Sequence, residues 1–128
     1  MHEAKCEFER ALKIKVISVG RDKSHLYLPF SDVVKNPNGV IHGGAIMSLA
    51  DSAMAVVMGE LFNSSCFATK KFQINFKNPA KCDIFARAKI LKQKGKFVYL
   101  EAVISDKNQT LIAQAEGVFF RLDGLPGA

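Results

Sequence analysis

Two groups in the chain have side chains or backbone suited to chemistry: the tripeptide His42-Gly43-Gly44 and the carboxylate of Asp51. The tripeptide opens a long apolar segment. The first turn of a helix there would carry free backbone N–H groups at the positive end of the helix dipole. Glycine has no side chain to keep a ligand oxygen away from those donors. The pattern therefore suits a carbonyl oxygen that becomes negative in a transition state, although close packing at an ordinary loop-to-helix junction would explain the same glycines.

Asp51 is notable for its apolar surroundings. From Gly43 to Phe62 the only ionisable side chains are Asp51 and Glu60, so the segment predicts a buried helix with a carboxylate at its centre. A carboxylate in such a place is costly to ionise unless something pairs with it or uses it. Asp51 is therefore either a catalytic group or a structural carboxylate that bonds to neighbouring backbone or serine groups.

The spacing between the two groups limits how they can work together. Asp51 lies nine residues after His42, which in a helix is about 13.5 Å along the axis and half a turn around it. The two cannot serve one reacting atom from the same helix. If both are catalytic, they come from two copies of the chain related by a two-fold axis.

The elements that hold these groups follow from the hydrophobic pattern. We expect a short helix over residues 3–11, a hairpin of strands near 12–16 and 25–30, and one long buried helix over 43–62. A turn at 63–65 then precedes four alternating segments near 72–76, 84–90, 98–104 and 111–117, which are separated by short turns. The prediction is a single α+β domain over residues 1–128, with a six-stranded antiparallel sheet wrapped around one long central helix.

The composition fits a globular domain and excludes several classes of protein. The 128 residues are 48% apolar and 23% charged, which are ordinary globular values. No signal peptide is visible, and Asp51 with three glycines and two serines argues against a membrane span over 43–62. Three cysteines without a CxxC pair indicate a reducing, cytoplasmic compartment, and the absence of HExxH, P-loop or clustered His/Cys patterns predicts no metal and no cofactor.

The positive charge of the chain is concentrated in one segment. Between Lys70 and Lys96 there are nine basic side chains and a single acid, Asp83, within a chain of net charge +6. Such a segment would attract an anionic partner, for example a nucleotide phosphate, RNA or an acidic lipid headgroup. Solvated lysines on the outer face of a sheet are the alternative.

One spaced set of residues resembles the hot-dog-fold acyl-CoA thioesterases of the phenylacetate-degradation type: Asn36, Gly39, His42-Gly43-Gly44, Leu49 and Asp51, with Thr69 and Asn78-Pro79-Ala80 in the same register. The resemblance covers almost the whole chain, because two strands, a long helix and four strands are also the order of that family. It implies a hot-dog fold and the hydrolysis of acyl-CoA thioesters without a cofactor. It also implies a homodimer, often paired into a homotetramer, with the active site at the dimer interface.

The resemblance assigns roles to single residues. It makes Asp51 a general base or nucleophile, and it makes the backbone N–H of Gly43 the donor to the thioester oxygen. His42 would orient the loop and bond near the sulfur or oxygen, and Asn36 would position water or substrate from the opposing half of the site. Thr69 occupies a position where relatives can carry serine, so a hydroxyl is kept.

The resemblance also gives the basic segment a partner. Coenzyme A carries a diphosphate and a 3′-phosphate, and the candidates for substrate binding are Gly44 at the helix start and the basic pair Lys70 and Lys71. Nucleic acid and membrane are not expected as partners, since no recognised motif interleaves aromatic residues with these lysines. A pocket for the acyl group could be lined by four residues that would equally serve as core: Met47, Met54, Met58 and Phe72.

Two other functions remain open from the sequence. One is a non-catalytic acyl-CoA-binding or regulatory module that uses the same cleft. The other is a hot-dog hydratase or dehydratase, although such enzymes commonly combine catalytic His and Asp in a different helix-loop pattern.

Overall fold

A computed structural model describes residues 1–62 and 66–122 of the chain. Helix α2 (Gly43–Phe62) is the longest element, and its bounds agree with the predicted helix. The other elements, in chain order, are β1 (His2–Glu3), α1 (Glu7–Ala11), β2 (Lys15–Val19), β3 (Lys23–Leu28), the 3-10 helix η1 (Asp32–Val34), β4 (Phe67–Phe76), β5 (Ile84–Lys94), β6 (Phe97–Asp106) and β7 (Leu111–Arg121).

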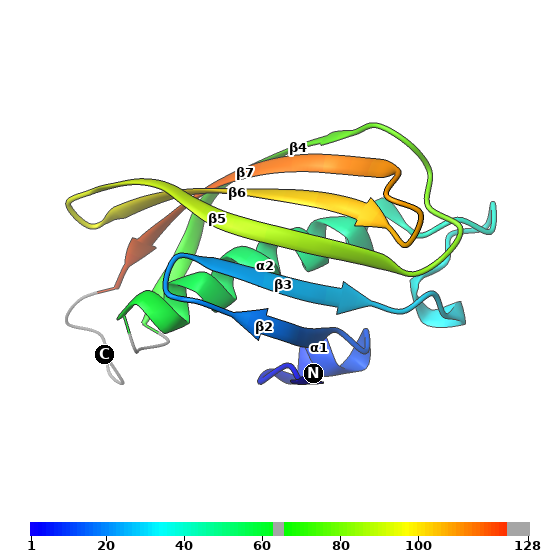
Figure 1. Cartoon of the computed structure of the whole chain (residues 1–128), viewed down its shortest axis with the longest axis horizontal. Helices are drawn as coiled ribbons and strands as arrows, with labels where there is room; N and C mark the ends of the chain where they lie inside the picture. Colours follow the sequence, from blue (N-terminus) through cyan, green and yellow to red (C-terminus); the bar gives the residue numbers. More distant parts are fainter. Residues whose placement is uncertain (63–65, 123–128) are drawn as a thin grey trace.

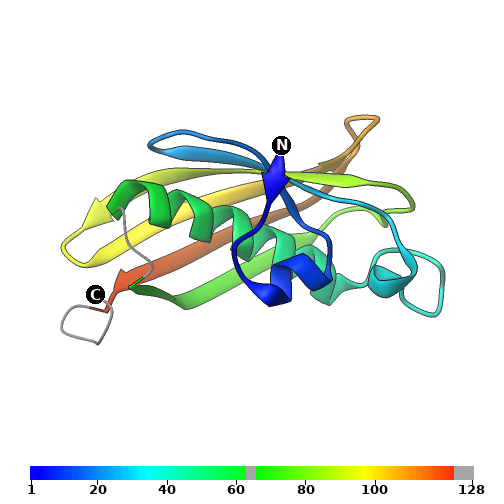
Figure 2. The same cartoon turned by 90° about the horizontal axis from the view of Figure 1, so that it is seen from below.

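The strands form one antiparallel sheet in the order β1-β2-β3-β5-β6-β7-β4. The sheet curves over α2 in Figure 1, and the view from below in Figure 2 shows α2 lying along one of its faces. Strand β4 directly follows α2 in sequence but lies at the far edge of the sheet, where β7 is its neighbour. Helix α2 and the edge strand β4 are therefore close in sequence, although β4 pairs only with β7 among the described strands.

Two details of the predicted fold were wrong. The sheet has seven strands rather than six, because β1 pairs with β2 through His2 and Glu3. A strand of two residues is too short to show an alternating pattern in the sequence. Because Glu3 belongs to this strand, the N-terminal helix begins at Glu7 and not at Glu3. The turn predicted at 63–65 lies outside the described residues.

The core lies between α2 and the concave face of the sheet. Alternate residues of β5 and β6 are buried against the helix: Ile84, Ala86, Ala88, Val98, Leu100, Ala102 and Ile104. Several of these residues are alanines, and at Gly117 of β7 an added Cβ would lie 2.6 Å from Sδ of Met54. Small side chains on the sheet therefore let the helix approach closely.

Helix α2 is long and apolar enough to span a membrane by length and composition alone, but half of its most apolar window is buried inside the molecule. Its buried residues include Leu49, Ala50, Ala53, Met54 and Val57, which have no exposed surface. The hydroxyl of Ser24 on β3 donates a 2.7 Å hydrogen bond to the carbonyl of Ala53. In this fold α2 is the core helix that the sequence predicted.

Candidate active site at helix α2 and strand β4

His42 forms the N-terminal cap of α2. Its Nδ1 accepts a 2.8 Å hydrogen bond from the N–H of Gly44, and its carbonyl accepts from the N–H groups of Ala45 and Ile46. The backbone N–H of His42 donates to the carbonyl of Val34 at 2.7 Å, which ties the loop to η1. Because Nδ1 is an acceptor, the neutral imidazole carries its proton on Nε2. The exposed His42 ring therefore presents an N–H donor near the helix start.

The two glycines after His42 have different roles. At Gly44 an added Cβ would lie 3.0 Å from Nδ1 of His42, so the imidazole would have to shift by a few tenths of an ångström to accept a side chain there. At Gly43 an added Cβ would only touch the ring of Phe76, at 3.5 Å. Among residues 1–62 and 66–122, no acceptor meets the N–H of Gly43. The free donor predicted at the helix start is therefore the one at Gly43, while the N–H of Gly44 is occupied by the cap.

Asp51 lies about two turns further along α2 than Gly44 and is only half-buried. Its Oδ1 accepts a 2.8 Å hydrogen bond from the hydroxyl of Thr69 on β4. This contact fits a structural carboxylate as well as a catalytic one, so the catalytic role of Asp51 stays a prediction. The carboxylate faces the edge strand of the sheet.

A β-bulge explains why Thr69 can reach Asp51. The pairing of β4 with β7 shifts register between Thr69 and Lys71. The side chains of Phe72 and Ile74 lie on the helix side of the sheet, opposite the buried Gly117 and Ala115. Strict alternation back from Phe72 would turn Thr69 to the outer face. The extra residue at the bulge reverses this, so that Thr69 faces α2.

The surroundings of Asp51 make it a stronger base than an ordinary aspartate. Burial raises the pKa of the Asp51 carboxyl, the hydrogen bond from Thr69 lowers it, and the negative charge of Glu9 raises it again, with a net rise above the ordinary value. A carboxylate with a raised pKa accepts a proton more readily, which suits general-base chemistry.

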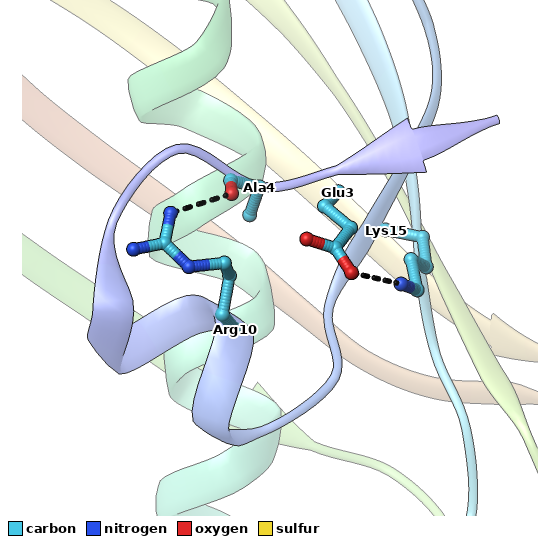
Figure 3. A network of polar contacts seen from close by, with 4 residues as sticks. All are labelled: Glu3, Ala4, Arg10 and Lys15. Atoms are coloured by element: carbon cyan, nitrogen blue, oxygen red, sulfur yellow. Dashed lines mark hydrogen bonds and ion pairs between the residues drawn. The ribbon is translucent and has the colours of Figure 1, made fainter.

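Glu9 belongs to α1, and no pattern in the sequence predicted that this helix would lie near Asp51. Figures 2 and 3 show α1 beside α2. Two polar contacts stabilise the N-terminal segment: Nη1 of Arg10 donates to the carbonyl of Ala4 at 3.3 Å, and Nζ of Lys15 pairs with Glu3 at 3.3 Å (Figure 3). Ala4 itself is buried. Pairing of β1 with β2 joins this segment to the sheet, so the position of Glu9 is set by residues far from Asp51 in the sequence.

Asn36 stabilises the loop before the helix. Its Oδ1 accepts from the N–H groups of Asn38, at 2.9 Å, and Val40, at 3.3 Å. Gly39, with φ of +79°, donates its N–H to the carbonyl of Asn36 at 3.0 Å. The asparagine therefore shapes the turn that leads to His42, and its predicted role with water or substrate stays a prediction.

The predicted acyl-pocket residues divide into two pairs. Met54 and Met58 have no exposed surface and belong to the core, whereas Met47 is 40% exposed and Phe72 is half-buried. Met47 lies one turn before Asp51 on α2, and Phe72 lies on the helix side of β4. Only this second pair is open to a ligand beside Asp51.

Gly43 and Asp51 are eight residues apart on one straight element, which corresponds to about 12 Å along the axis. The chain therefore brings Thr69 to Asp51 but keeps the free N–H of Gly43 away from both. Lys70 and Lys71 are exposed and follow Thr69 directly. Within the described ranges, 1–62 and 66–122, no three His, Cys, Asp or Glu side chains are grouped so that they could hold a metal ion.

Comparison with known proteins gives consistent matches. The sequence model of the thioesterase superfamily matches residues 38–113, which is more than half of the chain and includes the α2–β4 site. A candidate esterase of Saccharolobus solfataricus is 26% identical over 112 residues, which are 87% of this chain and 80% of the relative.

Two solved structures share the architecture. The PaaI protein from the phenylacetic acid degradation operon of Escherichia coli superimposes with a TM-score of 0.86 and 22% identity, over 94% of this chain and 87% of that one. A Staphylococcus aureus thioesterase gives a TM-score of 0.85 and 20% identity, over 90% and 98%. At these identities the likeness concerns the fold, and it confirms the predicted hot-dog arrangement of a sheet around one helix.

Proposed function

The chain belongs to the thioesterase superfamily, and we propose that it hydrolyses acyl-coenzyme A thioesters to a free acid and coenzyme A. In this proposal Asp51 is the base that activates water, and the backbone N–H of Gly43 stabilises the oxyanion. Each active site takes these two groups from different subunits of a homodimer. We further propose a cytoplasmic location, in keeping with three cysteines that include no CxxC pair.

The observation that carries the proposal is the position of both groups relative to β4. Asp51 is bonded to Thr69 near the beginning of this strand, and Gly43 lies against Phe76 at its end. Strand β4 pairs with β7 on one side and ends the described sheet on the other. An edge strand of ten residues presents unpaired backbone groups that readily pair with another chain.

Pairing two β4 strands antiparallel about a two-fold axis would complete the site. If the axis passes between Phe72 and Gln73, Thr69 of one subunit lies opposite Phe76 of the other. Asp51 of the first subunit is then brought toward Gly43 of the second. The same operation builds a second, identical site. This arrangement removes the separation of about 12 Å that a single helix imposes.

The chemistry then needs no group beyond these. The Asp51 carboxylate takes a proton from water as the water oxygen attacks the thioester carbonyl carbon. The carbonyl oxygen becomes negative and accepts from the N–H of Gly43, with the Nε2–H of His42 as a second donor at the same helix start. When the C–S bond breaks, Asp51 returns the proton to the thiolate. Direct attack by the carboxylate, followed by hydrolysis of an anhydride, would use the same two groups.

Mixed dimers provide the test. Asp51→Asn removes the base. Gly43→Pro removes the N–H donor at a helix position that favours proline, so the helix should persist. Each variant alone is expected to be inactive. After the two are unfolded and refolded together in equal amounts, half of the dimers are mixed and each mixed dimer contains one intact site, so about a quarter of the wild-type thiol release should return.

The control is to refold each variant by itself under the same conditions. No recovery in the mixture, with dimers shown by light scattering, would contradict a site shared between subunits. If the wild-type chain binds acyl-CoA without releasing thiol, the non-catalytic binding module is the correct alternative. If thiol is released, a screen of acyl-CoAs that differ in chain length and in aromatic content would define the acyl group that binds beside Met47 and Phe72.

A further inference from the structure

The outer face of the sheet carries a group of aromatic and basic side chains that has no part in the proposed hydrolysis. In β6, Val98 and Leu100 are fully buried against α2. Because side chains alternate along a strand, Phe97 and Tyr99 face outward. We call the following group of residues the lysine–aromatic surface: Lys70, Lys71, Lys92, Lys94, Phe97, Tyr99 and Phe120.

The strand register groups these residues in two adjacent rows. One row runs across the sheet as Lys92, Tyr99, Val118 and Lys71, which are successive partners on β5, β6, β7 and β4. The next row contains Lys94, Phe97 and Phe120. Bulges at Ile90/Lys92 and at Thr69/Lys71 shift β5 and β4, the two strands at the ends of these rows. They turn Lys92 outward and leave Lys70 as the extra residue.

The side chains are in contact with one another. Nζ of Lys70 lies 4.5 Å from the centre of the Phe97 ring, and Nζ of Lys92 lies 4.7 Å from the centre of the Tyr99 ring. The rings of Phe97 and Phe120 are 6.2 Å apart and inclined by 32°. Cations over ring faces are attracted by the ring quadrupole. The exposed ammonium groups lie over the rings, so a flat ligand that stacks there would displace them toward its own phosphates.

A depression of about 200 Å³ lies beside Tyr99 and is lined by Lys71, Leu91, Val118 and Glu116, among others. The next row of the sheet is acidic, with Glu101 and Glu116 as direct partners and Lys89 paired to Glu101 at 3.3 Å. These carboxylates bound the positive area and would repel a long polyanion that crossed the sheet. The surface therefore suits a short anion with one flat ring system.

We propose that the lysine–aromatic surface binds a nucleoside phosphate, with the base stacked beside Tyr99 and Phe97 and the phosphates held by the lysines. Aromatic side chains stack any base, and ammonium groups bind phosphate oxygens. Glu116 at the depression can accept from an amino group of the base. The ligand is either the nucleotide end of the acyl-CoA substrate or a free nucleotide. The first source rests on the proposed function, and binding itself does not.

The substrate could connect the two places because Lys70 follows Thr69 directly. Thr69 faces Asp51 on the helix side, and the side chain of Lys70 reaches the outer face over Phe97. In the proposed dimer the paired β4 strands close this edge between Thr69 and Phe76, so a substrate would reach from Asp51 to the basic surface around the beginning of β4, at Phe67 and Ala68.

Binding is measured by calorimetric titration of the dimer with adenosine 3′,5′-bisphosphate at two salt concentrations. Tyr99→Leu keeps apolar volume but removes the ring, and should weaken binding about tenfold with the same salt dependence. Lys92→Gln with Lys94→Gln should weaken it by a similar factor, about tenfold, and flatten the salt dependence. Lys5→Gln with Lys81→Gln makes the same charge change at exposed sites elsewhere and should bind like the wild type.

The source is then decided by kinetics on the best acyl-CoA and on the pantetheine thioester of the same acid. If the surface holds the nucleotide end of the substrate, the Lys92/Lys94 variant raises KM for acyl-CoA far more than KM for the pantetheine thioester. If the Lys92/Lys94 variant loses bisphosphate binding but changes KM for acyl-CoA and KM for the pantetheine thioester by the same factor, the ligand is a free nucleotide.

Two results would overturn the inference. One is bisphosphate binding that is absent in the wild type or unaffected by either variant. The other is tight binding of an eight-nucleotide RNA, lost in both variants, without binding of the bisphosphate. A chain that binds the bisphosphate but hydrolyses no thioester would disprove the proposed function and leave this surface in place.

Discussion

The hydroxyl of Thr69 donates a 2.8 Å hydrogen bond to Oδ1 of Asp51, across the space between strand β4 and helix α2. This contact joins a residue exposed at the sheet edge to a half-buried carboxylate, and it depends on a bulge one residue further along the strand. It defines where a reacting group could approach Asp51.

Asp51→Asn should lower kcat by about 10²–10⁴, the usual contribution of a general base. The same change should stabilise the fold at neutral pH. The raised pKa of Asp51 means that the native state holds a proton more tightly than the unfolded chain, so stability falls as pH rises above the ordinary value of 3.8. Asparagine cannot ionise and keeps an acceptor for Thr69. Urea unfolding at pH 7 should show the gain, and unchanged kcat would remove Asp51 from catalysis.

The neighbours of Asp51 should move the pH profile in opposite directions. The bond from Thr69 lowers the pKa of Asp51, so Thr69→Val should shift the acidic limb of the kcat profile to higher pH. The charge of Glu9 raises that pKa, so Glu9→Gln should shift the limb to lower pH. Thr69→Ser keeps the hydroxyl and serves as the control. Shifts in the same direction for both variants would contradict these roles.

The two glycines at the start of α2 should respond differently to alanine. At Gly43 the added methyl meets Phe76 at an ordinary 3.5 Å, whereas at Gly44 it meets the His42 ring at 3.0 Å. Gly44→Ala should therefore be less stable than Gly43→Ala by about 1 kcal/mol, the typical value of a lost N-terminal cap. In a His42→Ala background the difference should largely disappear. Chemical denaturation of the four variants measures this, and equal stabilities with His42 present would count against the cap.

Asp83 should stabilise the end of β3. It accepts from the hydroxyl of Tyr27 at 2.6 Å and from the N–H of Phe30 at 2.7 Å. The hydrogen bond to Asp83, partial burial and the negative charge of Asp83 together raise the pKa of the Tyr27 phenol to about 12. In a Tyr99→Phe chain, absorbance titration should place the remaining tyrosine near this value, and Asp83→Ala should bring it down toward 10.

The same substitution tests how much the contact contributes. Partial burial raises the pKa of Asp83, but the bonds from Phe30 and Tyr27 outweigh it and leave that pKa below the ordinary value. The stabilisation is therefore present above the ordinary value of 3.8 and is lost as pH falls through the lowered pKa. Asp83→Ala should cost about 1 kcal/mol at pH 7, because the group is largely solvated, and less near pH 2. A cost that does not depend on pH would show that packing, not charge, is responsible.

Local patterns in the sequence were sufficient for the main elements and for part of the site. The apolar run from Gly43 to Phe62 predicted the helix, and alternation predicted six of the seven strands. His42-Gly43-Gly44 predicted a free donor at the helix start, because capping and glycine geometry act over three or four residues. The spacing of His42 and Asp51 also indicated that one helix cannot join the two.

Only the tertiary structure could decide which side chains meet. The bulge at Thr69/Lys71 turns Thr69 toward Asp51, the packing of α1 brings Glu9 near it, and strand pairing places Phe97 beside Phe120. Each of these contacts joins residues more than fifteen positions apart, and a shift of one residue in register would reverse the face of every side chain beyond it. The sequence determined the chemistry available to this protein, because residue types and local backbone geometry depend only on residues a few positions apart. Sheet register and packing decided its arrangement, because they arise only when distant segments come together.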